Sequence, residues 1–277
     1  MMDLNKLKCV IELGSTNINC VIAEDDDENI KIIATSTIAS IGIHNGVIIN
    51  PLEAAKAIRS CLSDVESKAN VVLKKASVVL EMPEFNCTRL SKYRKIDGSK
   101  IQKDDIVFLL KEAKKEVNIN DKKRTIIHIF NHNYIVDGKK FIKEPIGVYA
   151  DHLSHEMTFI TVPKNIIKNL NEVFIECDLE IERLISSTFA LAVNYLNNTE
   201  FELGSMIVDI GFEKTSIGIF KNFALIHSRT FPVGIHHVTK DISKGCSLSL
   251  DEAKYIRDQM GCFYWEKDMD FKKENNL

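Results

Sequence analysis

The sequence contains no long apolar run and no excess of charge of one sign. Its longest unbroken apolar stretches, Ile106–Leu110 and Phe189–Val193, are five residues long, far short of the ~20 residues that a membrane-spanning helix needs. Lys and Arg number 36 against 39 Asp and Glu, which gives a formal net charge of −3. Because non-specific nucleic-acid binding requires a strongly basic surface, this balance argues against nucleic acid as a partner.

Paired cysteines and metal-binding clusters are also missing. None of the seven cysteines forms a C-x-x-C pair, so we expect small, mostly buried thiols in a reducing cytosol. His128 and His132 are four residues apart in a strand-like stretch, where even spacing places both on one face. A metal there would need further ligands, so ordinary surface histidines are the favoured interpretation. No signal peptide opens the chain, which predicts a cytoplasmic protein.

The composition is that of an ordinary globular protein, with 45% apolar and 27% charged residues. At roughly 150 residues per domain, the length predicts about two domains. Hydrophobic periodicity and turn residues then divide the chain into an opening region, a central region from about residue 84 to 160, and a closing region.

The opening region begins with the pattern of three strands joined by tight turns. Cys9–Leu13 is apolar around Glu12, and Gly14 interrupts it before apolar and polar residues alternate from Asn17 to Ile22. After the acidic run Glu24–Glu28, a third strand is expected at Ile30–Thr35. A helix should follow, with Asn50 as its N-cap and Pro51 at its first position. Its buried stripe is expected to comprise Leu52, Ala55, Ile58, Leu62 and Val65.

The central region predicts a compact inserted subdomain of strand, helix, strand and strand. Its helix is expected at Lys103–Val117, where apolar residues recur at helical spacing. Strands are expected at Thr125–Phe130, Tyr134–Val136, Phe141-Ile142 and Met157–Val162. The strand Ala76–Met82 should precede this subdomain, and helices at Asn165–Glu176 and Thr188–Leu196 should follow it.

The closing region repeats the opening pattern. Ser205–Ile210 is apolar around Asp209, Gly211 interrupts it, and strands are expected at Ser216–Phe220 and Phe223–Phe231. Glu12-Leu13-Gly14 and Asp209-Ile210-Gly211 therefore occupy equivalent places in two copies of one unit. A repeat of this kind predicts two similar lobes that face each other.

The repeated turns carry the residue types of a nucleotide site. Glycine at Gly14 lets backbone amides approach a phosphate, and the hydroxyls of Ser15 and Thr16 add donors. Glu12 and Asp209 are placed to hold Mg²⁺ through water, since Mg²⁺ prefers carboxylates and retained waters. Either turn alone would be interpreted as an ordinary β-turn, but their shared strand context favours a nucleotide held between two lobes. Neither a P-loop nor G-x-G-x-x-G occurs.

These motifs, in this order, resemble those of the bacterial cell-division family FtsA, within the actin-like ATPase superfamily. Val10–Thr16 resembles its first phosphate motif, and Ile207–Gly211 its second. Tyr134–Gly138 with Glu144–Val148 is similar to its inserted subdomain, and Phe231–Gly234 resembles the turn that follows the second motif.

The resemblance implies an α/β, actin-like (ribonuclease H-like) duplicated fold with an inserted strand-helix-strand-strand (SHS2) subdomain. Residues 1–83 and 160–203 would form the first lobe, 84–159 the insert, and 204–277 part of a second lobe. The segments that would complete the second lobe and the membrane-binding helix of that family are not visible, so we expect a chain that is incomplete at its C-terminus. Phe263, Tyr264 and Trp265 are interpreted as core residues of the shortened lobe.

The resemblance also implies a function. Members of that family are adaptors that anchor the FtsZ ring to the inner membrane, self-associate into filaments and recruit later divisome membrane proteins, in part through the insert. The location implied is the cytoplasm, or the cytoplasmic face of the inner membrane at the division site if an anchor is present. ATP turnover in the family is weak or absent, so ATP is expected to be a structural switch. The alternatives are an actin-like assembly protein of type IV pili and, behind it, a small-molecule kinase.

The site residues follow from the matched motifs, with ATP and Mg²⁺ as the implied ligands. Nucleotide contacts are expected from Gly14, Ser15, Thr16, Asn17, Gly211, Lys214, Thr215, Gly234 and Arg257, and Mg²⁺ contacts through water from Glu12 and Asp209. The second phosphate turn departs from the family pattern, because Phe212 and Glu213 replace two glycines. We therefore expect added bulk and a negative charge near the phosphates, at a cost on the order of 1 kcal/mol that Lys214 offsets in part.

Overall fold

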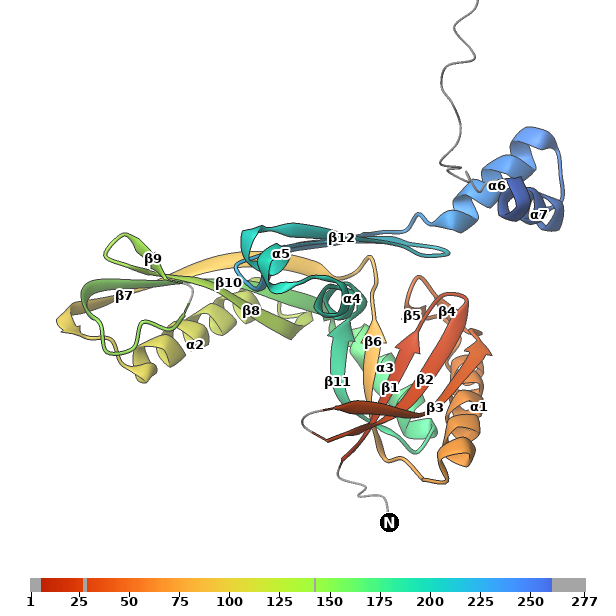
Figure 1. Cartoon of the computed structure of the whole chain (residues 1–277), viewed down its shortest axis with the longest axis horizontal. Coiled ribbons are helices and arrows are strands. Elements are labelled where there is room, and N and C mark those ends of the chain that lie inside the picture. Colours follow the sequence, from red (N-terminus) through yellow and green to blue (C-terminus); the bar gives the residue numbers. More distant parts are fainter. Residues whose placement is uncertain (1–5, 27–28, 142, 261–277) are drawn as a thin grey trace, which may run out of the picture.

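The structure is a computed structural model that describes residues 6–26, 29–141 and 143–260. In this part of the chain the strands form three sheets of five, four and three strands and one two-stranded hairpin. Figure 1 shows the five-stranded sheet at the lower right, the four-stranded sheet at the left and the three-stranded sheet above them. The predicted cluster Phe263–Trp265 lies outside the described residues.

The five-stranded sheet forms the first lobe, in the order β11-β6-β1-β2-β3. Its strands are β1 (Leu7–Leu13), β2 (Asn17–Asp25), β3 (Ile30–Ala39), β6 (Lys75–Leu80) and β11 (Glu180–Ser186). The first three are antiparallel, as the alternation predicted, and β1 and β11 both run parallel to β6. Helices α1 (Pro51–Ala69) and α3 (Lys164–Glu176) pack on this sheet and contribute to one apolar core.

The N-terminus of α1 has the predicted cap. The Asn50 side chain accepts a hydrogen bond from the Glu53 amide, and Pro51 occupies the first helical position. The predicted stripe is buried except at Leu52, which is 68% exposed. A step of about 100° per residue carries Leu52 outside the arc centred on Ile58 and Val65.

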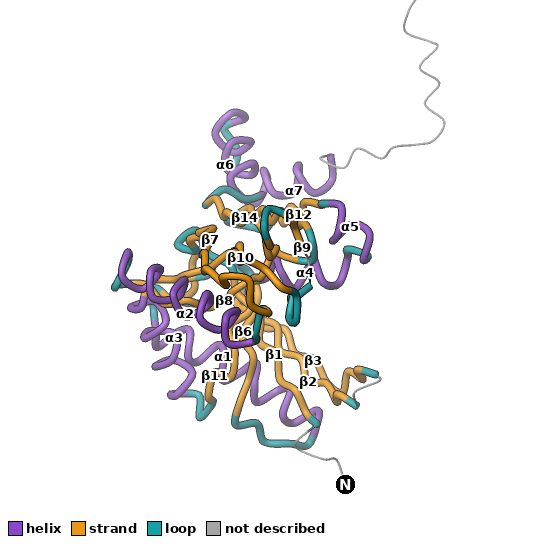
Figure 2. Tube along the Cα trace, turned by 90° about the vertical axis from the view of Figure 1, so that its left-hand side faces the viewer, coloured by secondary structure: helices purple, strands orange, loops and turns teal. Residues whose placement is uncertain are grey.

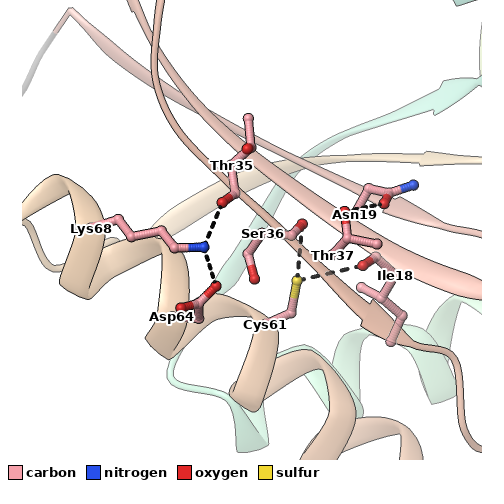
Figure 3. Close-up of polar contacts among 8 residues, drawn as sticks. All are labelled: Ile18, Asn19, Thr35, Ser36, Thr37, Cys61, Asp64 and Lys68. Carbon is pink, nitrogen blue, oxygen red and sulfur yellow. Dashed lines mark hydrogen bonds and ion pairs between the residues drawn. The ribbon is translucent and has the colours of Figure 1, made fainter.

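Polar contacts add to the apolar packing between α1 and the sheet (Figure 3). The Cys61 thiol lies 3.6 Å from the carbonyl oxygens of Ile18 and Ser36. Lys68 donates to the Thr35 carbonyl at 3.0 Å and to Asp64 at 2.6 Å. Four of the six described cysteines are buried, Cys87 is half-buried and Cys246 is exposed, which agrees with the prediction of mostly buried thiols.

The insert is a four-stranded antiparallel sheet in the order β7-β10-β8-β9. Its elements are β7 (Asn86–Lys100), α2 (Lys103–Asn120), β8 (Arg124–Val136), β9 (Lys139–Phe141) and β10 (Tyr149–Pro163). The two strands predicted between residues 125 and 136 are one strand, β8, whose pairing with β10 is interrupted by bulges. β10 runs through residues 159–160, so the insert continues directly into the first lobe.

The three-stranded sheet contains β12 (Ser205–Ile210), β13 (Thr215–Lys221) and β14 (Ala224–Phe231). Helices α4 (Ser187–Tyr195) and α5 (Asn198–Leu203) precede it. Its inner face shares a core with α4 and the insert, in which Ile160, Ala192, Phe220 and Leu225 are buried. Helices α6 (Ile235–Cys246) and α7 (Leu250–Met260) follow and pack on each other, at the opposite end of the molecule from the five-stranded sheet (Figure 2).

Candidate functional site

The first predicted phosphate turn joins β1 to β2. The Gly14 amide donates to the Asn17 carbonyl at 3.1 Å, which closes the turn. A Cβ atom at Gly14 would lie 2.6 Å from that carbonyl oxygen, so a side chain here requires the turn to shift. The Ser15 hydroxyl is buried and makes no hydrogen bond of normal geometry.

The second turn joins β12 to β13 with the same geometry. The Gly211 amide donates to the Lys214 carbonyl at 2.9 Å. The strand registers also correspond, since Glu12 pairs with Asn19 and Asp209 pairs with Ser216. In both hairpins the acid lies two residues before the glycine, so the repeat seen in the sequence is a repeat in three dimensions.

The two turns face one cavity of about 200 Å³. It is lined by Glu12, Leu13, Gly14, Ser15, Thr16, Asn17, Asn19, Leu80, Glu81, Ser187, Asp209, Gly211, Phe212 and Lys214. Eight of these are predicted site residues, drawn from segments almost 200 positions apart. An adjoining cavity of about 720 Å³ shares Glu12, Asn19, Ser187 and Asp209 with it.

Lys214 brings a positive charge into this cavity. Its side chain is half-buried, and its ammonium donates to the backbone carbonyl of Glu81 at the end of β6. Burial lowers the pKa of Lys214, while the carboxylates of Glu81, Asp209 and Glu12 oppose that change. The chain therefore supplies its own cation between the two lobes.

The two predicted metal-binding acids have different surroundings. Glu12 accepts a hydrogen bond from the Asn19 side chain at 2.8 Å. The pKa of Asp209 is raised by burial and by the Glu12 carboxylate, and Lys214 offsets part of that rise. Since desolvation penalises a charged carboxylate, a nearby cation stabilises the ionised form of Asp209.

The Glu213 carboxylate, which the sequence predicts near the phosphates, accepts hydrogen bonds from His44 Nδ1 at 2.7 Å and from the Asn45 amide at 2.9 Å. Burial would raise the pKa of Glu213, but the Asn45 amide, Ser15 and His44 together hold it below its usual range. These partners lie in the hairpin of β4 (Ile43–His44) and β5 (Val47–Ile48), so Glu213 links the second turn to the first lobe.

Three predicted site residues lie outside the cavity lining. The Thr215 hydroxyl donates to the Val233 carbonyl at 2.7 Å. Gly234 packs against the second turn, where a Cβ atom would lie 2.5 Å from the Gly211 and Phe212 carbonyl oxygens. Arg257 donates to the Thr239 hydroxyl at 2.7 Å within the α6–α7 pair. The predicted nucleotide contacts of all the site residues remain predictions.

Glu81 is the main residue of this site that the sequence reasoning did not single out. It is 1% exposed and accepts hydrogen bonds from the Ser186 hydroxyl, the Thr188 amide and hydroxyl, and the Thr230 hydroxyl. Burial raises its pKa, and these donors oppose that rise. An acid at the end of the predicted apolar strand Ala76–Met82 was the available signal, because a buried acid requires partners.

The sequence suggested that His128 and His132 are ordinary surface residues, but in the structure both rings make contacts inside the protein. His128 accepts a hydrogen bond from the Ser186 amide at 3.0 Å, and the buried His132 ring contacts the Thr158 hydroxyl at 2.6 Å. Within the described ranges, no group of three or more His, Cys, Asp or Glu side chains is arranged to hold a metal ion.

Family models match both the inserted subdomain and the region that begins at β12. A family model for the SHS2 domain inserted in FtsA matches residues 84–161, and one for cell division protein FtsA matches residues 206–275. The chain belongs to the FtsA family. The identification agrees with the motifs from which the sequence predicted it.

FtsA proteins from distant bacteria align with almost the whole chain. The FtsA of Bacillus subtilis (strain 168) is 28% identical over 268 residues, which is 96% of this chain and 60% of the relative. The FtsA of Buchnera aphidicola subsp. Baizongia pistaciae is 29% identical over 264 residues, or 94% of this chain and 62% of the relative. The chain thus spans about three-fifths of the length of these FtsA relatives.

Solved structures show the same fold at low sequence identity. The PilM-PilN type IV pilus biogenesis complex superposes with a TM-score of 0.65 at 11% identity, over 92% of this chain and 70% of that one. The ethanolamine utilization protein EutJ from Carboxydothermus hydrogenoformans gives a TM-score of 0.52 at 15% identity, over 92% and 62%. The predicted actin-like α/β fold with an SHS2 insert is confirmed.

Proposed function

We propose that this protein is a cell-division adaptor that links the FtsZ ring to the inner membrane and recruits later divisome proteins, with ATP as a structural ligand. The observation that carries the proposal is a single cavity faced by both repeated turns, in a chain that aligns with FtsA relatives over more than 90% of its length. In this account the insert contacts later division proteins, and copies of the chain associate into filaments.

The first turn supports the choice of a phosphate-bearing ligand. The Ser15 and Thr16 residues both line the cavity at this turn, where their hydroxyls add donors for phosphate oxygens. Gly14 lies so close to the Asn17 carbonyl that a side chain does not fit there, and the backbone of the first turn therefore carries no side-chain bulk at this position. We assign the polyphosphate to this turn and to Lys214.

Attachment to the membrane belongs to the proposal as well. No helix among the described residues combines the length and the apolar character needed to cross a bilayer. Contact with the inner membrane is proposed from the similarity to FtsA relatives.

The test is direct binding of the FtsZ C-terminal tail peptide to the full chain, measured by fluorescence anisotropy. A scrambled peptide is the control, and an inner-membrane pilus peptide tests the PilM-like alternative, which the fold similarity supports. We expect saturable binding of the FtsZ tail alone. Absence of that binding, or preference for the pilus peptide, contradicts the division role. A fluorescent fusion that fails to reach an intact FtsZ ring would contradict it independently.

A further inference from the structure

The cavity between the lobes holds an ammonium where the family's chemistry leads one to expect a metal ion. The carboxylates of Glu12 and Asp209 line this cavity together with the Lys214 side chain. The Lys214 ammonium also feels the charge of Glu81 and Glu213. Lys214 thus lies within the electrostatic influence of four carboxylates from three different segments, while its ammonium itself donates to the Glu81 backbone carbonyl.

Three elements hold the Lys214 ammonium in place. It belongs to the tight second turn and donates to the Glu81 carbonyl at the end of β6. The β4–β5 hairpin closes the third side at Gly46, where a Cβ atom would lie 2.9 Å from Lys214 Nζ and 2.2 Å from the Glu81 oxygen. Gly46 therefore leaves the room that this contact needs, and its positive φ of 81° suits glycine.

A divalent cation does not fit this arrangement. Mg²⁺ would be expected to use the two acids and several retained waters. A fixed ammonium in the same small cavity repels a second cation and competes for the same carboxylates.

We propose that Lys214 takes the place of the divalent cation, so that the cavity excludes Mg²⁺ and accepts the polyphosphate of a nucleotide without metal. The choice of ligand rests on the function proposed above, whereas the exclusion of metal rests on the cavity alone. Lys214 then both neutralises the acids in the absence of nucleotide and donates to phosphate oxygens when nucleotide is bound. A lysine is a compact point charge suited to that exchange.

The first experiment measures Mn²⁺ binding to the full chain without nucleotide, by electron paramagnetic resonance. The variants are Lys214→Met and Lys214→Gln, with Lys221→Met at the end of β13 as the matched control. We expect no Asp209-dependent Mn²⁺ site in the parent or the control, and a new site in both Lys214 variants that Asp209→Asn removes. An Asp209-dependent site in the parent, or no gain in two folded Lys214 variants, overturns the proposal.

The second experiment measures ATP affinity in Mg²⁺ and in EDTA. We expect the parent and Lys221→Met to bind equally in both buffers, and Lys214→Met to bind about tenfold more weakly in EDTA and to recover with Mg²⁺. If the parent needs Mg²⁺, the inference fails and the proposed nucleotide role stands. If ATP binds in neither buffer, the nucleotide role fails, and the Mn²⁺ result still decides whether Lys214 excludes metal.

Discussion

His155 is the residue through which the insert should respond most strongly to pH. Its side chain is 1% exposed, stacks on Tyr134 at a ring distance of 4.2 Å, and has no hydrogen-bond partner at either ring nitrogen within the described residues. Burial lowers its pKa to about 4, and the neighbouring His132, whose pKa is also lowered to about 4, adds to the effect. The folded state therefore requires a neutral imidazole.

We therefore predict that the free energy of unfolding falls in acid. Since the pKa of His155 is lower in the folded state than its ordinary 6.5, its neutral form stabilises the fold fully above pH 6.5 and progressively less as the pH falls toward 4. At pH 5 the loss is about 2 kcal/mol.

We expect His155→Phe to keep the ring stack and remove this titration. Urea unfolding at pH 7.5 and pH 5 should show a gain of about 2 kcal/mol at pH 5 relative to the parent. The same substitution at the exposed His227, His227→Phe, is the control. An identical pH slope in the parent and His155→Phe would show that His155 is not the responsible group.

At the scale of elements, β13 packs on α4 through a glycine. A Cβ atom at Gly218 would lie 2.4 Å from Thr188 Cγ2 and 3.0 Å from the Phe220 ring. Gly218→Val should destabilise the protein by about 1–3 kcal/mol, because the added methyl groups overpack this contact. Gly245→Ala in α6, with no neighbour within 4 Å, should be neutral or slightly stabilising. Equal urea midpoints for the parent and Gly218→Val would contradict the packing described.

Helices and strands with a clear hydrophobic period could be predicted from the sequence. Strands that depend on pairing with a distant strand could not. The cap of α1, its stripe apart from Leu52, and the alternation of β2 are confirmed because local sequence determines them. β7 was missed because its exposed positions are mostly polar or charged, and only its pairing with β10 makes it a strand. The β4–β5 hairpin, two residues on each side of Asn45-Gly46, is too short to show any period.

At the scale of the whole molecule, the two copies of the repeat are covered differently. In β1 the residues Cys9, Ile11 and Leu13 are buried under the helices of the first lobe. Their counterparts in β12, Met206, Val208 and Ile210, are 58%, 46% and 67% exposed. Helices α6 and α7 pack on each other beyond the end of the three-stranded sheet (Figure 1). The outer face of the second copy is therefore an exposed apolar surface.

The sequence predicted that the two acid-x-Gly turns meet between the lobes but not how the charges around them are arranged. The shared register of the acid-x-Gly turns was enough to bring Glu12, Gly14, Asp209 and Gly211 to one cavity. The orientation of Glu213 toward His44 could not be predicted, because it depends on a hairpin more than 150 residues away.

Equilibrium ATP binding tests whether the two turns form one nucleotide site. We expect saturable binding of one ATP per chain, and a loss of at least about tenfold in Gly14→Glu, where a side chain strains the turn and adds a negative charge. Gly245→Glu carries the same charge change in open space and should bind like the parent. No saturable binding by the parent, or equal binding by Gly14→Glu, would contradict the account.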